Sequence, residues 1–177
     1  MRARKCGGFL LAVLVTVGAL PAVGQRASDE PRPSPNASIS QTIGVTEVTI
    51  SYGRPGVKGR EIWGALVPYG QVWRTGANEA TTISLSTGVI IEGQKLAPGT
   101  YALFTIPSAN EWTLIFNKTA QQWGAFSHDA SQDALRVTVK PQAADHSEWM
   151  SFQFEDLSED SATVVLRWGK VAVPFKI

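Results

Sequence analysis

Residues 96–116 read LAPGTYALFTIPSANEWTLIF, and this stretch decides the fold class. Segment 101–106 is apolar at nearly every position, which predicts a central strand covered on both faces. Pro98 and Gly99 precede it in the two middle positions of a four-residue turn, where they favour type II geometry. A second turn follows, and Trp112, Leu114 and Phe116 then share one face of the next strand. Strands joined by such short turns predict an antiparallel sheet.

Similar short strand patterns recur on both sides of this stretch. They cover residues 45–52, 82–86, 89–96, 135–139, 150–154, 163–168 and 171–177. The helical candidate is segment 60–67, which Pro68 limits to one or two turns. About nine short strands with hairpin turns predict an all-β protein, an antiparallel β-sandwich of jelly-roll or immunoglobulin-like type, with a β-barrel as the alternative.

The N-terminus has the three parts of a secretory signal. Arg2, Arg4 and Lys5 are followed by an apolar run of 14 residues at 7–20, which is too short to span a bilayer comfortably. Small residues at positions 22 and 24 predict cleavage before Gln25, and an uncleaved N-terminal anchor is the alternative. We therefore expect an exported protein, periplasmic or extracellular, with no membrane span after cleavage.

Cleavage would also change the composition of the chain. The leader carries three of the 16 basic residues, none of the 15 acidic residues, and the single cysteine, Cys6. The mature chain would have 13 basic and 15 acidic residues, a net charge of −2, and neither a thiol nor a disulfide. A charge this close to zero gives no reason to expect nucleic acid as a partner.

The mature chain divides into two parts. Residues 25–38 alternate proline with polar residues, which predicts an extended linker. Residues 39–177 then form a single β-sandwich domain, large enough to be stable through its own core. The oligomeric state has no signature in the sequence.

The long irregular segment 54–81, RPGVKGREIWGALVPYGQVWRTGANEAT, is the first candidate for a functional site. Long loops that mix charged and aromatic residues with glycine and proline are either functional or disordered, and the tryptophans argue against disorder. The proposed ligand-binding residues are Arg54, Arg60, Trp73, Arg74, Asn78 and Glu79. Arginines suit carboxylate, phosphate or sulfate, and tryptophan stacks on sugar rings.

A structural interpretation of the same loop competes with the functional one. Arg74 with Glu79, or Arg60 with Glu61, could form ion pairs that order the loop, and Trp63 and Trp73 could be core residues. An enzyme has less support, because a single carboxylate, Glu79, has no evident catalytic partner.

Known catalytic and metal-binding signatures are absent from the sequence. It contains no G-x-S-x-G, H-E-x-x-H, P-loop or paired-cysteine motif. His128 with Asp129 and Asp133 is a weak metal-binding candidate, better explained as a solvated loop, and His146 falls in a segment with the composition of a loop. We therefore predict no metal and no cofactor, and we assign no catalytic residue.

Several longer phrases resemble a bacterial exported family called domain of unknown function 2911. They are YGRPGVKGREIWGALVPYG, VWRTGANEATT, LAPGTYALFTIP, WTLIFNK, and WG-x-F followed by LRVTVKP. The resemblance extends over about residues 38–177 and implies a bacterial, exported, β-rich domain without supplying a reaction. Its matching positions fall in the candidate loop, namely Arg54, Gly56, Gly59, Arg60, Trp73, Arg74, Thr75, Gly76, Asn78 and Glu79. The family pattern L-P-A-G-T-Y appears here as LAPGTY at 96–101, which keeps the turn chemistry.

Taken together, these features predict an exported module that binds a small ligand, such as a sugar, a peptide end or an anion, through segment 54–81. A hydrolase-like enzyme that uses Glu79 as acid or base is one alternative. A purely structural envelope protein is the other.

Overall fold

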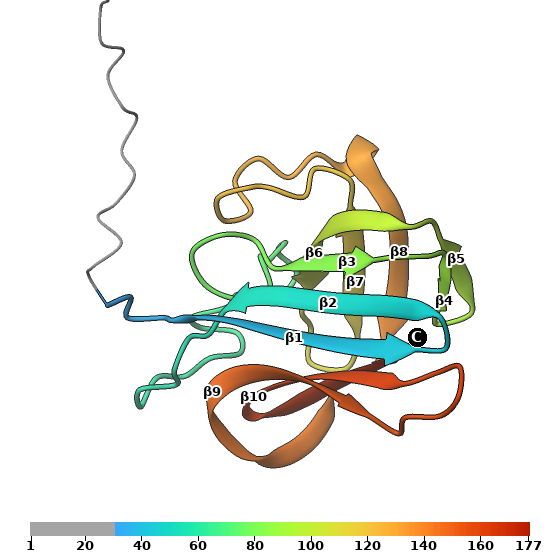
Figure 1. The fold of residues 1–177 in the computed structure, drawn as a ribbon. Helices are drawn as coiled ribbons and strands as arrows, with labels where there is room; N and C mark the ends of the chain where they lie inside the picture. Colours follow the sequence, from blue (N-terminus) through green and yellow to red (C-terminus); the bar gives the residue numbers. More distant parts are fainter. Residues whose placement is uncertain (1–30) are drawn as a thin grey trace, which may run out of the picture. The chain divides into compact units, whose positions relative to one another are not determined.

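The computed structural model describes residues 31–177, in which every regular element except one 3-10 turn (η1, Ala130–Gln132) is a β-strand (Figure 1). The predicted leader and residues 25–30 of the predicted linker lie outside the described residues. The all-β class predicted from the sequence is confirmed. Across residues 31–177, no helix has the length and apolar character needed to cross a membrane.

The described part of the chain contains ten strands. They are β1 (Asn36–Ile43), β2 (Thr46–Gly53), β3 (Thr82–Leu85), β4 (Val89–Ile91), β5 (Gln94–Leu96), β6 (Gly99–Ile106), β7 (Trp112–Asn117), β8 (Asp133–Val139), β9 (Gln142–Glu155) and β10 (Thr163–Lys176). Strand β1 begins inside the predicted linker. The strands predicted at 163–168 and 171–177 are one strand, β10, whose pairing is irregular around Gly169.

The strands form three antiparallel sheets that do not close into a barrel. The largest has the order β1-β2-β3-β6-β7-β8, β9 pairs with β10, and β4 pairs with β5. All neighbours in the large sheet run antiparallel. The long β9–β10 ribbon lies across the large sheet, which gives the predicted sandwich-like arrangement (Figure 1).

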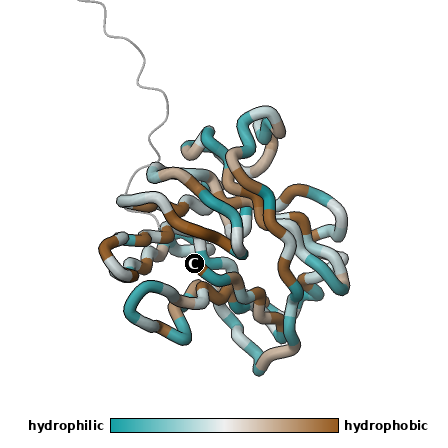
Figure 2. The backbone as a smooth tube through the Cα atoms, turned by 90° about the vertical axis from the view of Figure 1, so that its right-hand side faces the viewer, coloured by the Kyte–Doolittle hydropathy of each residue, from teal (hydrophilic) through white to brown (hydrophobic). Residues whose placement is uncertain are grey.

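The apolar faces of the large sheet and the ribbon meet in the main core. Phe116 of β7 packs edge-on against Phe175 of β10 at 6.3 Å between ring centroids, and Tyr52 of β2 packs against Phe152 of β9 at 5.0 Å. In Figure 2 the hydrophobic residues gather along the strands, and many of the turns are hydrophilic.

A second, smaller apolar group lies outside the main core. It consists of Ala80, Ala102, Phe104 and Ile115, and we call it the outer cluster. Val72 and Ala125, from two different loops, pack against it. Strand β6 is therefore buried on both faces, as its continuous apolar run predicts.

Two local predictions are wrong. Segment 60–67 is not helical, because Gly64 has a φ of +87° and the Val67 N–H donates to the Ile62 carbonyl, five residues back. His146 lies in strand β9 and not in a loop. The residues around it are mostly exposed, so the alternation that marks a half-buried strand is missing there.

Candidate functional site

Segment 54–81 connects β2 to β3 and is folded through turns and single bridges. It is anchored on β6 by a pair of hydrogen bonds, in which Trp73 N–H donates to the Thr105 carbonyl at 2.7 Å and Thr105 N–H donates to the Trp73 carbonyl at 2.9 Å. Ile62 and Val67 from the same segment are buried in the main core. The segment is therefore an ordered part of the fold.

The two tryptophans of the segment pack among other tryptophans. Trp63 lies 4.8 Å from Trp112 between ring centroids, and Trp73 is stacked on Trp168 at 5.9 Å with 14° between the ring planes. Trp112 and Trp168 are buried core residues of β7 and β10. This packing favours the structural interpretation for Trp73, which the sequence offers as a stacking surface for a ligand.

Two of the candidate arginines donate to backbone carbonyls. Arg54 Nε donates to the Met150 carbonyl at 2.8 Å, which ties the segment to β9. Arg60 donates through Nη2 to the Gly56 carbonyl at 2.7 Å and through Nε to the Val57 carbonyl at 3.1 Å. Both side chains therefore contribute to the order of the loop.

Arg74 differs from every other arginine in residues 31–177. Its side chain makes no hydrogen bond or ion pair with any of these residues, and its Nε is buried without a partner. Burial lowers the pKa of the Arg74 guanidinium below its ordinary value. The Arg74 side chain is only partly buried, but a buried polar atom such as its Nε is nearly always paired in a folded protein. Trp63 Nε1 is also buried without a partner, and ring packing against Trp112 explains the position of Trp63. Hydrogen bonds and ion pairs within residues 31–177 do not explain the position of the Arg74 side chain.

The position of Arg74 follows from its neighbours. Trp73 packs in the main core, whereas Val72 packs against the outer cluster. Side chains alternate along an extended segment, so Arg74 lies on the same side as Val72. This is the side of the large sheet on which Ala125 and its loop also lie.

The turn that follows Arg74 is strained. Thr75 and Asn78 have φ angles of 54° and 65°, in the left-handed region that a β-branched residue such as threonine rarely adopts. Thr75 is held in place by hydrogen bonds from its hydroxyl to Thr105 Oγ1 and to the Trp73 carbonyl. Strain of this kind is often found at binding sites, where surrounding contacts maintain it.

The last two candidate residues, Asn78 and Glu79, contact residues near the start of the described chain. Asn78 donates through Nδ2 to the Ser34 carbonyl at 3.2 Å, and Glu79 pairs with Arg32 at 2.8 Å. The ion pair considered from the sequence, Arg74 with Glu79, is not formed. Glu61 likewise forms no ion pair with Arg60 within residues 31–177.

A second loop, residues 118–132, lies directly beside this turn. Ala80 N–H donates to the Gln122 carbonyl at 2.9 Å, and Gly124 N–H donates to the Asn78 carbonyl at 3.0 Å. The loop presents Trp123, which is 57% exposed, and Phe126, which is 86% exposed. Neither aromatic is among the site residues predicted from the sequence. Large aromatics within a stretch rich in Gly, Ser and Asp are the signal that could have identified them.

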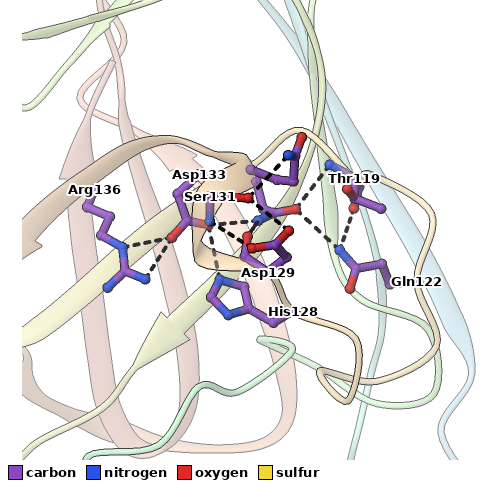
Figure 3. A network of polar contacts seen from close by, with 9 residues as sticks. Thr119, Gln122, His128, Asp129, Ser131, Asp133 and Arg136 are labelled. Atoms are coloured by element: carbon purple, nitrogen blue, oxygen red, sulfur yellow. Dashed lines mark hydrogen bonds and ion pairs between the residues drawn. The ribbon is translucent and has the colours of Figure 1, made fainter.

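The second loop is held by a polar network centred on Asp133 (Figure 3). Asp133 accepts from Asn117 Nδ2 at 2.7 Å, pairs with Arg136 at 2.7 Å, and lies 3.0 Å from His128 Nε2. Burial alone would raise the pKa of Asp133, but the hydrogen bonds from Asn117, Arg136 and His128 together lower it.

Asn117 continues the network into the loop backbone. Its Nδ2 also donates to the Asp129 carbonyl, and its Oδ1 accepts from the N–H of Thr119 and from Gln122 Nε2. Most polar atoms of this network have a protein partner, and Gln122 Oε1 is buried without one. In the described part of the chain, no group of three or more His, Cys, Asp or Glu residues could hold a metal ion. Hydrogen bonds within the protein account for the positions of His128, Asp129 and Asp133.

Two loops meet at the turn that follows Arg74, and the comparison with protein families covers both of them. A family model described as "Protein of unknown function (DUF2911)" matches residues 34–177. The chain belongs to this family. The match includes both loops and all ten strands of this DUF2911 protein. No curated protein and no solved structure matched the chain.

Proposed function

We propose that this DUF2911 protein is an exported module that binds a small ligand through an anionic group. The anionic group, a carboxylate, sulfate or phosphate on a sugar, a peptide end or a free anion, pairs with the guanidinium of Arg74. The observation that carries the proposal is the buried Arg74 Nε without a partner. A planar guanidinium suits two-pronged recognition of such groups.

Two neighbouring features support a ligand at this place. The strained turn at Thr75 and Asn78 fixes the backbone on one side of Arg74. Trp123, half-exposed on the adjoining loop, offers an aromatic face of the kind on which sugar rings pack. Arg54, Arg60, Asn78 and Glu79 each already have partners in the protein.

The proposal is tested by urea unfolding of wild type and Arg74→Met, each with and without sulfate, acetate or glucuronate. Removing a partly buried, unpaired charge should leave the free energy of unfolding unchanged or raise it. A specific anion should stabilise the wild type by about 2.7 kcal/mol at 100 times its Kd and should not stabilise the variant. Sulfate also stabilises proteins generally, so the difference between the two proteins is the measured quantity.

Arg167→Met is the matched control, because Arg167 pairs with Glu155 within the β9–β10 ribbon. It should retain the anion effect of the wild type. If Arg74→Met lowers the free energy of unfolding by about 3–5 kcal/mol and no anion acts on the wild type, Arg74 is a structural brace and the proposal is wrong. Turnover of a ligand that Glu79→Gln abolishes would support the hydrolase alternative instead.

A further inference from the structure

A cavity lies at the end of the sandwich where the chain terminates, away from the two loops described above. It has a volume of about 860 Å³ and is lined by residues of the β1–β2 turn and the β4–β5 hairpin and by the C-terminal residues Lys176 and Ile177. Small-molecule pockets are typically about 300–1,000 Å³, so this cavity can enclose a ligand. None of residues 54–81 contributes to its lining.

The walls of this cavity are largely apolar. Five of the lining side chains are aliphatic and belong to or pack on the main core. They are Ile43, Val48, Val89, Leu96 and Ile177. Ile90, which is 56% exposed, continues the apolar surface on the hairpin. The hydrophobic wall is therefore backed by the rigid core, which suits a preformed site for an apolar group.

The lining also carries two lysines and two carboxylates, and they differ in their partners. Glu92 Oε1 accepts a hydrogen bond from the Lys176 backbone N–H at 2.5 Å, and Asp160 Oδ1 accepts one from the Ser158 hydroxyl at 3.5 Å. The side chains of Lys95 and Lys176 make no hydrogen bond or ion pair with residues 31–177. The two ammonium groups are therefore without a partner among these residues, whereas each carboxylate keeps its negative charge and accepts one hydrogen bond from a neutral donor.

An apolar cavity with unpaired ammonium groups has the complementary chemistry of a single-chain amphiphile with an anionic headgroup. We propose that this cavity binds such a molecule, with its alkyl chain against the aliphatic walls and its headgroup at Lys95 and Lys176. A medium-chain fatty acid carries both features. The site is independent of the one proposed at Arg74, because it uses different residues and an apolar contact.

The test is calorimetric titration of the purified protein with decanoate, hexanoate and decyltrimethylammonium, each below its micelle concentration. Decanoate should bind saturably, and each methylene removed should weaken binding about two- to fourfold. Decyltrimethylammonium has the same chain with a cationic head and should bind at least tenfold more weakly. Equal binding of the two decyl compounds would overturn the assignment of an anionic headgroup.

Three variants locate the site. Ala97→Trp places a large ring on an exposed lining residue, and the Lys95→Glu, Lys176→Glu double variant reverses the charge of both ammonium groups. Each should reduce decanoate affinity at least tenfold. Lys118→Glu, at an exposed lysine outside the cavity, should bind like the wild type. Absence of saturable decanoate binding, or unchanged affinity in both cavity variants, would overturn the proposal.

Discussion

At the scale of single residues, the site depends on an unusually close backbone contact. A Cβ added at Gly53 would lie 2.2 Å from the Ala77 carbonyl oxygen, a distance that atoms cannot adopt without a shift of backbone. A Cβ at Gly76 would lie 3.0 Å from the Gly53 carbonyl oxygen. The end of β2 and the strained turn after Arg74 can therefore approach this closely only because Gly53 and Gly76 have no side chain.

Gly53→Ala should consequently destabilise the protein. Forcing extra volume into a packed site costs about 1–3 kcal/mol, and here the obstacle is backbone, which yields less easily than a side chain. The free energy of unfolding in urea measures this effect. Gly88→Ala is the control, because its added Cβ would make only ordinary contacts and its φ is unremarkable. A Gly53→Ala protein as stable as Gly88→Ala would show that the turn can move.

At the scale of elements, the Asp133 network fixes the loop at 118–132 to strands β7 and β8. The pKa of Asp133 is lowered in the folded protein, so the unfolded chain binds more protons between the folded and unfolded pKa values. The stability that Asp133 contributes is therefore present above the unfolded pKa, about 3.9, and is lost as the pH falls through the folded pKa.

Asp133→Asn should weaken the attachment of the loop to the strands. It should also make the free energy of unfolding depend less on pH in the acidic range. Asparagine removes the negative charge that pairs with Arg136 and keeps only one of the two acceptor oxygens, so either Arg136 or Asn117 loses its acceptor, and we expect a loss of about 1–3 kcal/mol at pH 7. The two proteins should differ less at pH 3, as measured by urea unfolding between pH 3 and 7. Asp145→Asn, at an exposed residue of β9, is the control. A pH-independent difference would contradict the assigned role.

At this scale, most of the strands and the position of the candidate loop were predictable from the sequence, and the contacts within the site were not. Strands with one buried face or two were predictable, because side-chain alternation at 135–139 or continuous apolarity at 101–106 records burial directly. The N-terminal half of β9 was not, because most of its residues are exposed. Segment 54–81 was identified as a candidate site by composition. That Arg74 lacks a partner while Arg54 and Arg60 have theirs depends on contacts with β9 and the local turn, which no sequence pattern records.

At the scale of the whole molecule, the large sheet, the β9–β10 ribbon and segment 54–81 meet at one cluster of tryptophans. Trp63 and Trp73 of the segment contact each other, and each also contacts Trp112 of the large sheet and Trp168 of the ribbon, with ring centroids 4.8–6.3 Å apart. Trp168 is 1% exposed. The large sheet, the ribbon and segment 54–81 are therefore joined through this cluster.

Trp168→Ala should lower the free energy of unfolding by about 3–5 kcal/mol, the usual cost of emptying a buried aromatic site. Differential scanning calorimetry should show one transition at a lower temperature, because the sheets share the cluster. Trp149→Ala is the matched control, since Trp149 is 39% exposed and contacts Lys58 at the surface. If Trp168→Ala gave a separate low-temperature transition, the β9–β10 ribbon would be an independent folding unit.

The tryptophan cluster has a further consequence for the light that the protein absorbs. Indole transitions at these separations couple to one another, so the four rings act as a joint chromophore with a strong circular dichroism signal that isolated tryptophans lack. Such a signal depends on fixed side-chain packing and disappears when strands persist without it. The protein thus contains an intrinsic optical reporter at the point where sheet, ribbon and candidate loop meet.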